Sequence, residues 1–386
     1  MLKASLVSLI LPAVAFAAGP TVTRLDGTRI TAAQIDATVT RSMQQAGLPG
    51  IGIALFNNGR VVYAKAYGER DQADRKPLTP DSIMTAASLT KPAFAVMVLQ
   101  LVEQGVLDLD RPVAHYLPKP LPDYASYADL ASDRRYEKIT LRMLLAHTSG
   151  FPNWRRFTDD RKLAIYFDPG SRFAYSGEGI ALAQLVVETV TGKSAEALMR
   201  ERIFQPLGMT RTSLVWQRRF EDDYANAYER GKSLGPQRRQ QPDAAGSMQT
   251  TLHDYARFVQ AMLKGELLRE ESTAEMFSPQ IRITSAHEFP TLATETTTAN
   301  DTIRLSYGLG WGLYWTPYGK AIFKEGHDDG WQHYVVMFPK TRSGLLIMTH
   351  SDKGEDIYGE LIEELLHNRL TPYEWERFRR PPRPVQ

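Results

Sequence analysis

The stretch "TAASLTKPAFAVMVLQLVEQG", residues 85–105, decides how the rest of this chain is interpreted. Its apolar run over residues 93–102 predicts a helix that is buried on most sides. Ser88 is a candidate N-cap for this helix, and Pro92 is tolerated only in the first turn. Lys91 stands at the start of the buried run, three residues after Ser88, so the two side chains share one helix face.

Lys91 has two interpretations. It is either a solvated charge at a helix end or the base that removes a proton from Ser88. A serine hydroxyl is a poor nucleophile near neutral pH and needs a neighbouring base. A lysine serves as that base only if desolvation or a nearby cation lowers its pKa. A helix N-terminus helps in two ways. Its dipole disfavours a cation and so lowers the pKa of a lysine there, and its N–H groups bind an oxyanion.

Composition limits the other function classes. The chain has 386 residues and a 43% hydrophobic content, enough for one large domain or two interleaved ones. Its formal net charge of +2 offers no strong field to nucleic acid, so we expect no nucleic-acid partner. The chain has no cysteine and no paired-histidine spacing, so we expect no metal or other cofactor. It also lacks a P-loop, a strand-associated G-x-G-x-x-G and the G-x-S-x-G nucleophile elbow.

The N-terminus predicts export. Residues 1–17 have the pattern of a signal peptide, with Lys3, a short apolar stretch over residues 4–16 and the cleavage pattern Ala15-Phe16-Ala17. The apolar stretch is short for a bilayer span, although an uncleaved N-terminal anchor is the alternative. We therefore expect a periplasmic or secreted protein with no stable membrane span after signal cleavage.

Strand patterns occur at both ends of the chain, with helical patterns between them. Residues 50–68 predict a β-hairpin that turns at Asn57-Asn58-Gly59. Residues 321–326, 333–339 and 344–350 predict further strands. Helices are expected over residues 32–45, 139–151, 179–192, 195–209, 251–265 and 356–370, and residues 218–241 are expected to form a surface loop.

This order predicts an α+β fold. Both chain ends form an antiparallel sheet that helices flank, and an all-helical subdomain is inserted. We place the α/β subdomain at residues 20–106 and 246–370 and the helical subdomain at residues 107–245. Residues 371–386 are basic and proline-rich, which is typical of a partly ordered tail.

Two further residues are candidates for the site. Tyr175, in "PGSRFAYSGEG", follows a Pro-Gly turn and precedes a predicted helix, so its hydroxyl is placed to enter a cleft. Its ordinary role would be that of a core tyrosine with a satisfied hydroxyl. His327, in "KEGHDDGW", lies between two predicted strands and is otherwise a surface-turn histidine.

Six fragments, in order, carry a family resemblance. They are Ser88-Leu89-Thr90-Lys91, "HTSGFP", "PGSRFAYSG", "PLGMTRTS", "YGLGWGL" and "EGHDDGW". Over about residues 32–366 the chain resembles the serine β-lactamase-related proteins, which include class C β-lactamases, D-alanyl-D-alanine carboxypeptidases, D-aminopeptidases and carboxylesterases. The resemblance implies a β-lactamase/transpeptidase-like fold.

The resemblance also implies roles for individual residues. Ser88 would be the acylated nucleophile, and Lys91 would be its base, alone or together with Tyr175. His327 would occupy the position of the lysine in the Lys-Thr-Gly motif, where many relatives carry His-x-Gly. The backbone N–H groups of Ser88 and Gly330 would form the oxyanion hole.

Three tryptophans lie near these motifs: Trp154, Trp311 and Trp331. They line an apolar acyl pocket or pack in the core.

Two departures from the family pattern bear on the substrate. Gly177 stands where the family's Tyr-x-Asn motif has the asparagine that contacts the substrate amide. Asp329 stands at the usual glycine of His-x-Gly, where its side chain would narrow the strand edge and place an acid beside His327. Both departures favour an esterase or peptidase over a dedicated β-lactamase.

We therefore expect an exported serine hydrolase that forms an acyl-enzyme on Ser88. Its substrate would be a small ester, a D-amino-acid peptide or a β-lactam. This small-molecule or peptide substrate could derive from the cell wall. The alternative is a non-catalytic, penicillin-binding-like protein that binds cell-wall fragments or a protein partner.

Overall fold

The computed structural model describes residues 21–378. The signal peptide expected at residues 1–17 and the last part of the expected tail lie outside the described residues. Within residues 21–378, no helix combines the length and the apolar character needed to cross a bilayer.

Residues 21–378 form a nine-stranded antiparallel sheet to which both chain ends contribute, as predicted. In spatial order its strands are β10 (Ile281–Arg282), β11 (Ser306–Tyr307), β12 (Gly312–Thr316), β13 (Gly319–Asp328), β14 (Trp331–Phe338), β15 (Ser343–Thr349), β3 (Gly50–Asn57), β4 (Arg60–Asp71) and β5 (Lys76–Pro77). The two ends meet where β15 pairs with β3, with Leu345 opposite Leu55 and Ile347 opposite Ile53.

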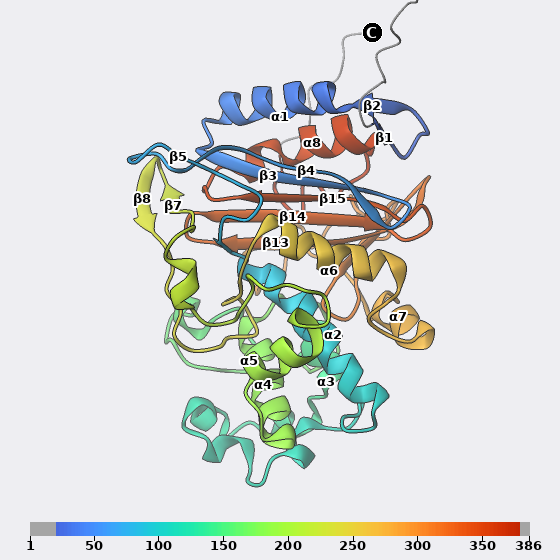
Figure 1. The fold of residues 1–386 in the computed structure, drawn as a ribbon. Coiled ribbons are helices and arrows are strands. Elements are labelled where there is room, and N and C mark those ends of the chain that lie inside the picture. Colours follow the sequence, from blue (N-terminus) through green and yellow to red (C-terminus); the bar gives the residue numbers. More distant parts are fainter. Residues whose placement is uncertain (1–20, 379–386) are drawn as a thin grey trace, which may run out of the picture.

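Helices cover both faces of the sheet (Figure 1). Helices α1 (Ala32–Ala46) and α8 (Glu355–Leu366) lie on one face, and α6 (Leu252–Lys264) lies on the other. Strand β3 is therefore buried on both sides: Ile53 and Leu55 join the core beneath α1 and α8, whereas Ala54 and Phe56 join the core toward α6. This two-sided burial explains the nearly continuous apolar run of the strand.

The remaining helices lie below the α6 face (Figure 1). They are α2 (Thr90–Glu103), α3 (Leu141–Leu145), α4 (Gly177–Thr191), α5 (Ala195–Met199) and α7 (Glu270–Met276), with a π-turn η7 (Arg200–Phe204) continuing α5. Short 3-10 turns fill the connections: η2 (Val113–Tyr116), η3 (Leu121–Asp123), η4 (Ala125–Leu130), η5 (Arg134–Lys138), η6 (Arg155–Phe157) and η8 (Arg218–Phe220).

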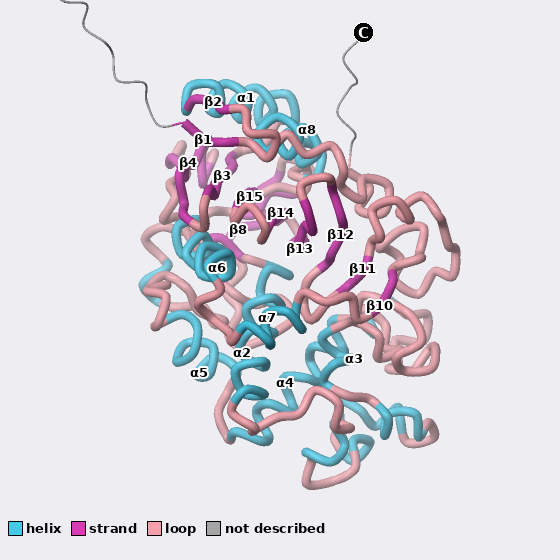
Figure 2. The backbone as a smooth tube through the Cα atoms, turned by 90° about the vertical axis from the view of Figure 1, so that its right-hand side faces the viewer, coloured by secondary structure: helices cyan, strands magenta, loops and turns pink. Residues whose placement is uncertain are grey.

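Helix α2 lies between the sheet and the helical region, and Figure 2 shows β12, β11 and β10 stepping down toward α3. The backbone confirms this approach, because the Gly310 N–H donates to the Leu145 carbonyl over 2.9 Å. The sheet and the helical region therefore share one core around α2.

Small strand pairs complete the fold. They are β1 (Thr21–Thr23) with β2 (Arg29–Thr31), β6 (Met84–Thr85) with β9 (Gln249–Thr250), and β7 (Ala227–Glu229) with β8 (Lys232–Gly235). The β7–β8 hairpin lies inside the segment that was expected to be only a surface loop, where polar residues hide the strand pattern.

The described part of the C-terminal segment, residues 371–378, packs against the domain. Tyr373, Trp375 and Phe378 are buried in the core beneath α1 and α8. Trp375 packs against Phe323, with ring centroids 6.3 Å apart, and its Nε1–H donates to Ser285 Oγ over 3.1 Å. Arginine and proline dominate the composition here, but the aromatic residues between them anchor residues 371–378 to the domain.

We expect Trp375→Ala to lower the free energy of unfolding by about 3–5 kcal/mol, because it empties a fully buried site. Urea denaturation followed by circular dichroism measures this change. Leu370→Ala, at a position 39% exposed, is the control and should change stability by less than about 0.5 kcal/mol. Equal effects of the two substitutions would contradict the packed C-terminal segment.

Candidate active site

Ser88 lies in a tight turn that leads into α2. The 3-10 turn η1 (Ala87–Leu89) precedes the helix, so Ser88 is not the N-cap that the sequence suggested. Ala87 has a φ of +48°, a strained conformation for a non-glycine residue that is frequent at functional sites. Within residues 82–99, all of which the structure describes, Ser88 alone is not fully buried. Its hydroxyl is thus held in a rigid turn and left accessible.

Lys91 is a buried neighbour of Ser88 and not a solvated charge. Its side chain is 2% exposed. Its Nζ lies 2.9 Å from Ser88 Oγ and donates to the Ala245 carbonyl over 2.6 Å. Burial, and then the positive charge of Lys324, lower the pKa of Lys91 to about 7. A large fraction of Lys91 is therefore neutral near pH 7 and able to accept the Ser88 proton.

Tyr175 lies beside both lysines. The Nζ atoms of Lys91 and Lys324 are 4.8 Å and 4.6 Å from the centre of its ring. Its hydroxyl is buried next to the Ser88 side chain, without the geometry of a full hydrogen bond. Burial raises the pKa of the Tyr175 phenol above its usual range. Tyr175 is accordingly a neutral proton donor in the site.

The "HTSGF" turn positions Tyr175. His147, at φ +56°, accepts through its carbonyl from the Ala174 N–H over 2.9 Å and through Nδ1 from the Ser176 N–H over 3.2 Å. Its ring lies 4.4 Å from that of Tyr175. Ser176 then caps α4 by accepting from the Gly179 N–H. The turn thus holds the backbone on both sides of Tyr175.

Lys324 is the site residue that the sequence analysis missed. It is fully buried in β13 and forms an ion pair with Glu325. Burial opposes its charge, but Glu325 and the groups around it outweigh burial and raise the pKa of Lys324 above its usual value. Lys324 therefore favours its charged form next to Tyr175, whereas Lys91 loses its proton more easily.

Strand β13 approaches the Ser88 turn through Gly326. A Cβ at Gly326 would lie 2.9 Å from the Ala86 carbonyl oxygen and 3.1 Å from Leu89 Cγ, so only glycine fits this contact. Strand β12 pairs with β13 only as far as Phe323, which leaves the β13 backbone beyond it with an open edge. The open edge of β13 begins with Lys324-Glu325-Gly326, which is a Lys-x-Gly sequence, and its Gly326 lies against the Ser88 turn.

A sequence model of the Beta-lactamase family matches residues 35–366 of the chain. The chain belongs to the Beta-lactamase family.

Individual members and structures agree with this assignment. Penicillin-binding protein 4* of Bacillus subtilis is 25% identical over 346 residues, which are 80% of this chain and 70% of that protein. Esterase EstB of Burkholderia gladioli is 33% identical over 218 residues, which are 49% of this chain and 53% of EstB. The structure of the octameric penicillin-binding protein homologue from Pyrococcus abyssi matches 90% of this chain and 80% of that chain with a TM-score of 0.71 and 23% identity, which supports the fold.

The sequence analysis placed His327 at the lysine position of the family's Lys-Thr-Gly motif, and this assignment was wrong. Its side chain is more than half exposed, and its Nδ1 lies 2.9 Å from Glu355 Oε1 at the start of α8. Glu355 also raises the pKa of His327, chiefly through this hydrogen bond. Successive residues of a strand point to opposite faces, so a one-residue step from Gly326 turns His327 away from the Ser88 turn. The Lys-x-Gly triplet begins three residues earlier, at Lys324.

The residues after His327 are also displaced from the site. Asp329 is exposed at the β13–β14 turn, where its N–H donates to Asp328 Oδ1. Gly330, with φ +72°, packs against Ala227 and Tyr228 of β7 and not against Ser88. Trp331 is 1% exposed and belongs to the core. The shift of register to Lys324 removes all three from the roles that the resemblance implied.

Gly177 makes room for Trp154. A Cβ at position 177 would lie 2.4 Å from Trp154 Cζ2, so the indole occupies the space of any side chain there. Trp154 also lines a cavity of about 480 Å³ on the helical side of the site. Trp311, by contrast, is fully buried and stacks on Phe258. Of the three tryptophans, only Trp154 is placed to meet a substrate.

Further buried carboxyl groups lie near the Lys324–Glu325 pair. Glu288 and Glu376 lie on two distant segments, and burial, and then the charge of Glu325, raise the pKa of Glu376 well above its usual value. Burial, and then the charge of Glu325, raise the pKa of Glu288 well above its usual value. Only the tertiary structure brings these carboxyl groups together, and Glu325 and Glu288 favour the charged form of Lys324.

We expect the acid limb of the pH profile of kcat/KM to have an apparent pKa near 7, because the base Lys91 must be neutral. Activity should rise with pH through that value. Replacing the buried pair by Lys324→Met with Glu325→Gln should move the limb to higher pH, since Lys324 lowers the Lys91 pKa more than Glu325 raises it.

Lys324→Arg, which keeps the cation, is the matched control and should leave the limb near its original pH. A limb that stays in place after removal of the pair would show that Lys91 is not the titrating base.

Proposed function

We propose that this hydrolase of the Beta-lactamase family acts through a Ser88 acyl-enzyme and prefers esters to amides. The observation that carries the proposal is the 2.9 Å contact between Lys91 Nζ and Ser88 Oγ, with the Lys91 pKa lowered to about 7. Together these give the serine a base in the protonation state that nucleophilic attack requires.

The first step follows from this geometry. Neutral Lys91 takes the Ser88 proton while Ser88 Oγ bonds to the carbonyl carbon of the substrate. The oxyanion lies between the Ser88 N–H and an N–H from the open edge of β13 beside Gly326, which replaces Gly330 in this role. The nearby Lys324 cation adds positive potential where negative charge develops.

The second step releases the alcohol. The bond between the carbonyl carbon and the leaving oxygen breaks, and that oxygen takes a proton from the Lys91 ammonium or the Tyr175 hydroxyl. Water then attacks the carbonyl carbon of the ester formed on Ser88 while one of the same two groups takes its proton. The bond between that carbon and Ser88 Oγ breaks, Ser88 Oγ takes the proton back, and the carboxylic acid leaves. Tyr175 suits this proton transfer, because it is neutral and lies beside both Ser88 and Lys91.

The preference for esters rests on Trp154 and Gly177. In amide-binding relatives the corresponding asparagine contacts the substrate amide, whereas here an indole fills its place and has no acceptor to offer. An ester has no N–H that needs a hydrogen-bond acceptor, so the absence of the asparagine costs it no binding energy. The likeness to an esterase from Burkholderia gladioli is in keeping with this preference.

The buried ammonium also favours a catalyst over a non-catalytic binder. Burying a lysine without a carboxylate partner is costly, and within the described residues Lys91 bonds only to Ser88 and a carbonyl. With the signal-peptide pattern of residues 1–17, we further propose that the enzyme works in the periplasm or outside the cell on a small-molecule or peptide substrate.

Ser88→Ala should abolish hydrolysis of p-nitrophenyl butyrate and labelling by a fluorophosphonate, as read by intact mass spectrometry. Lys91→Ala should lower kcat/KM by about 10²- to 10⁴-fold while the protein stays folded. Full turnover by Lys91→Ala, with Ser88→Ala inactive, would sink the proposed base. Absence of both labelling and turnover in the wild type would favour the non-catalytic alternative.

The ester preference is tested with a p-nitrophenyl ester and a p-nitroanilide that share one N-acylglycyl group. We expect the double variant Trp154→Ala with Gly177→Asn to raise the anilide-to-ester ratio of kcat/KM by about tenfold, the equivalent of one added hydrogen bond. Trp154→Ala alone enlarges the site without adding a partner and should leave the ratio unchanged. An equal rise in both variants would argue against amide recognition at position 177.

A further inference from the structure

The cavity lined by Trp154 adjoins the reaction centre at two points. Trp154 contacts Gly177, two residues after Tyr175. Asp243, also in the lining, lies two residues before Ala245, whose carbonyl binds Lys91. The volume of about 480 Å³ falls in the ordinary range of small-ligand pockets. The cavity therefore borders the two segments that position Tyr175 and Lys91.

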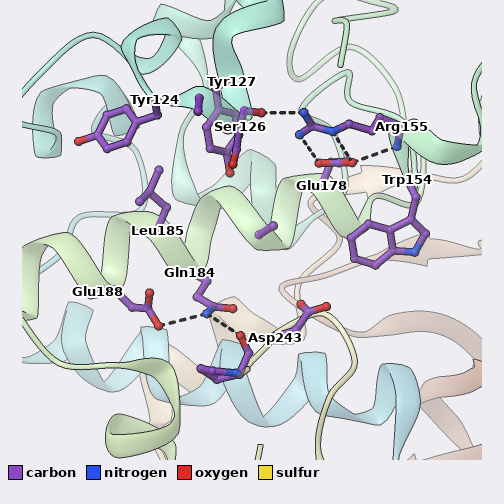
Figure 3. A pocket seen from close by; sticks show the side chains of 13 residues that line it. Tyr124, Ser126, Tyr127, Trp154, Arg155, Glu178, Gln184, Leu185, Glu188 and Asp243 are labelled. Carbon is purple, nitrogen blue, oxygen red and sulfur yellow. Dashed lines mark hydrogen bonds and ion pairs between the residues drawn. The ribbon is translucent and has the colours of Figure 1, made fainter. Parts of the chain in front are cut away.

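The cavity has aromatic walls and an excess of negative charge. Tyr124, Tyr127 and Trp154 supply the aromatic surface (Figure 3). Its charged lining comprises the carboxylates of Glu178, Glu188 and Asp243 and one cation, that of Arg155, so three negative charges and one positive charge leave a net charge of −2.

The positive charge of the lining is already neutralised. Arg155 donates to both carboxylate oxygens of Glu178, over 2.9 Å and 2.7 Å, as Figure 3 shows. The excess negative charge therefore belongs to Glu188 and Asp243, on either side of Gln184.

These two carboxylates receive only neutral donors among the hydrogen bonds of the described residues. Glu188 Oε1 accepts from Gln184 Nε2 over 3.1 Å and from the Ala195 N–H over 2.8 Å. Asp243 Oδ1 accepts from the Ala245 N–H over 2.8 Å. Neither carboxylate forms an ion pair within residues 21–378, although the field of Asp243 reaches Lys91.

We propose that this cavity is the acyl-chain subsite and that it selects substrates whose acyl chain ends in a cation. The inference rests on the proposed function. A cation there meets two carboxylates that have no cationic partner and aromatic walls that tolerate an alkylated ammonium. A neutral chain of the same shape gains the apolar contact but leaves both charges uncompensated.

The test uses two p-nitrophenyl esters of the same shape. One carries the 4-(trimethylammonio)butyryl group, and the other carries 5,5-dimethylhexanoyl, in which carbon replaces the charged nitrogen. We expect wild-type kcat/KM for the cationic ester to exceed that for the neutral ester by about tenfold at low salt, and the ratio to fall as salt rises. A wild-type ratio of one or less would overturn the proposal.

Variants assign the selectivity to the cavity. Glu188→Gln should lower the ratio about three- to tenfold, and Glu188→Gln with Asp243→Asn should bring it near one. Asp243 also acts on the pKa of Lys91, so its replacement changes the reactivity toward both esters. This common change cancels in the ratio of the two kcat/KM values, and only that ratio is compared. Glu201→Gln, at an exposed residue paired with Lys193, makes the same change in net charge and should leave the ratio unchanged. An equal fall in Glu201→Gln would overturn the assignment to this cavity.

A binding experiment separates the inference from the proposed function. Calorimetry measures binding of the two corresponding primary amides to Ser88→Ala protein, which needs no turnover. Preference for the cationic amide, lost in Glu188→Gln, supports the subsite even if both esters remain intact. Equal binding of the two amides overturns it even if the neutral ester is hydrolysed.

Discussion

The contact of the Lys91 ammonium with Ser88 Oγ and the Ala245 carbonyl is the constraint on which this structure depends. An amine taken out of water needs hydrogen bonds to remain buried, and its pKa falls because burial disfavours the charge. Helix α2 has to seat Lys91 between the sheet and the helical region. The segment before β9 has to supply Ala245, and the strained Ala87 holds Ser88 in reach. Two segments 154 residues apart in the chain thus meet at one side chain.

The two lysines of the site are held in different states by their surroundings. Lys91 has hydroxyl and carbonyl partners and a neighbouring cation, so it loses its proton easily. Lys324 has the carboxylate of Glu325 beside it and further carboxyl groups behind, so it keeps its charge. Tyr175 lies between them with its own proton retained. Burial and neighbouring charge, not residue type, thus distinguish the protonation of the two lysines, and the proposed roles of base and cation follow from this difference.

Trp154 links the chemistry to the choice of substrate. Its indole replaces a side chain at position 177 and forms one wall of the acidic cavity. The proposed ester preference and the proposed acyl-chain subsite therefore both depend on the position of this one indole. In such a site the loop that carries Trp154 and the start of α4 at Gly177 contact the substrate and set specificity. The rigid Ser88 turn and β13 hold the groups proposed to react.

The sequence by itself determined the strand character of both chain ends and the main helices between them. The apolar periods of 50–68 and 321–350 identified the strands, and 85–105 identified the buried helix with its Ser-x-x-Lys spacing, because these signals are local. The sequence did not determine which residue of "KEGHDDGW" faces Ser88. A one-residue change of strand register turns every side chain to the opposite face of the sheet. That register is set by the pairing of β13 with β12 and β14 and by the contact of Gly326 with the Ser88 turn.

The carboxyl groups around Lys324, the burial of Trp375 and the pairing of Trp154 with Gly177 also depended on the tertiary structure. Each joins segments that are far apart in the chain, and no local pattern records such a contact.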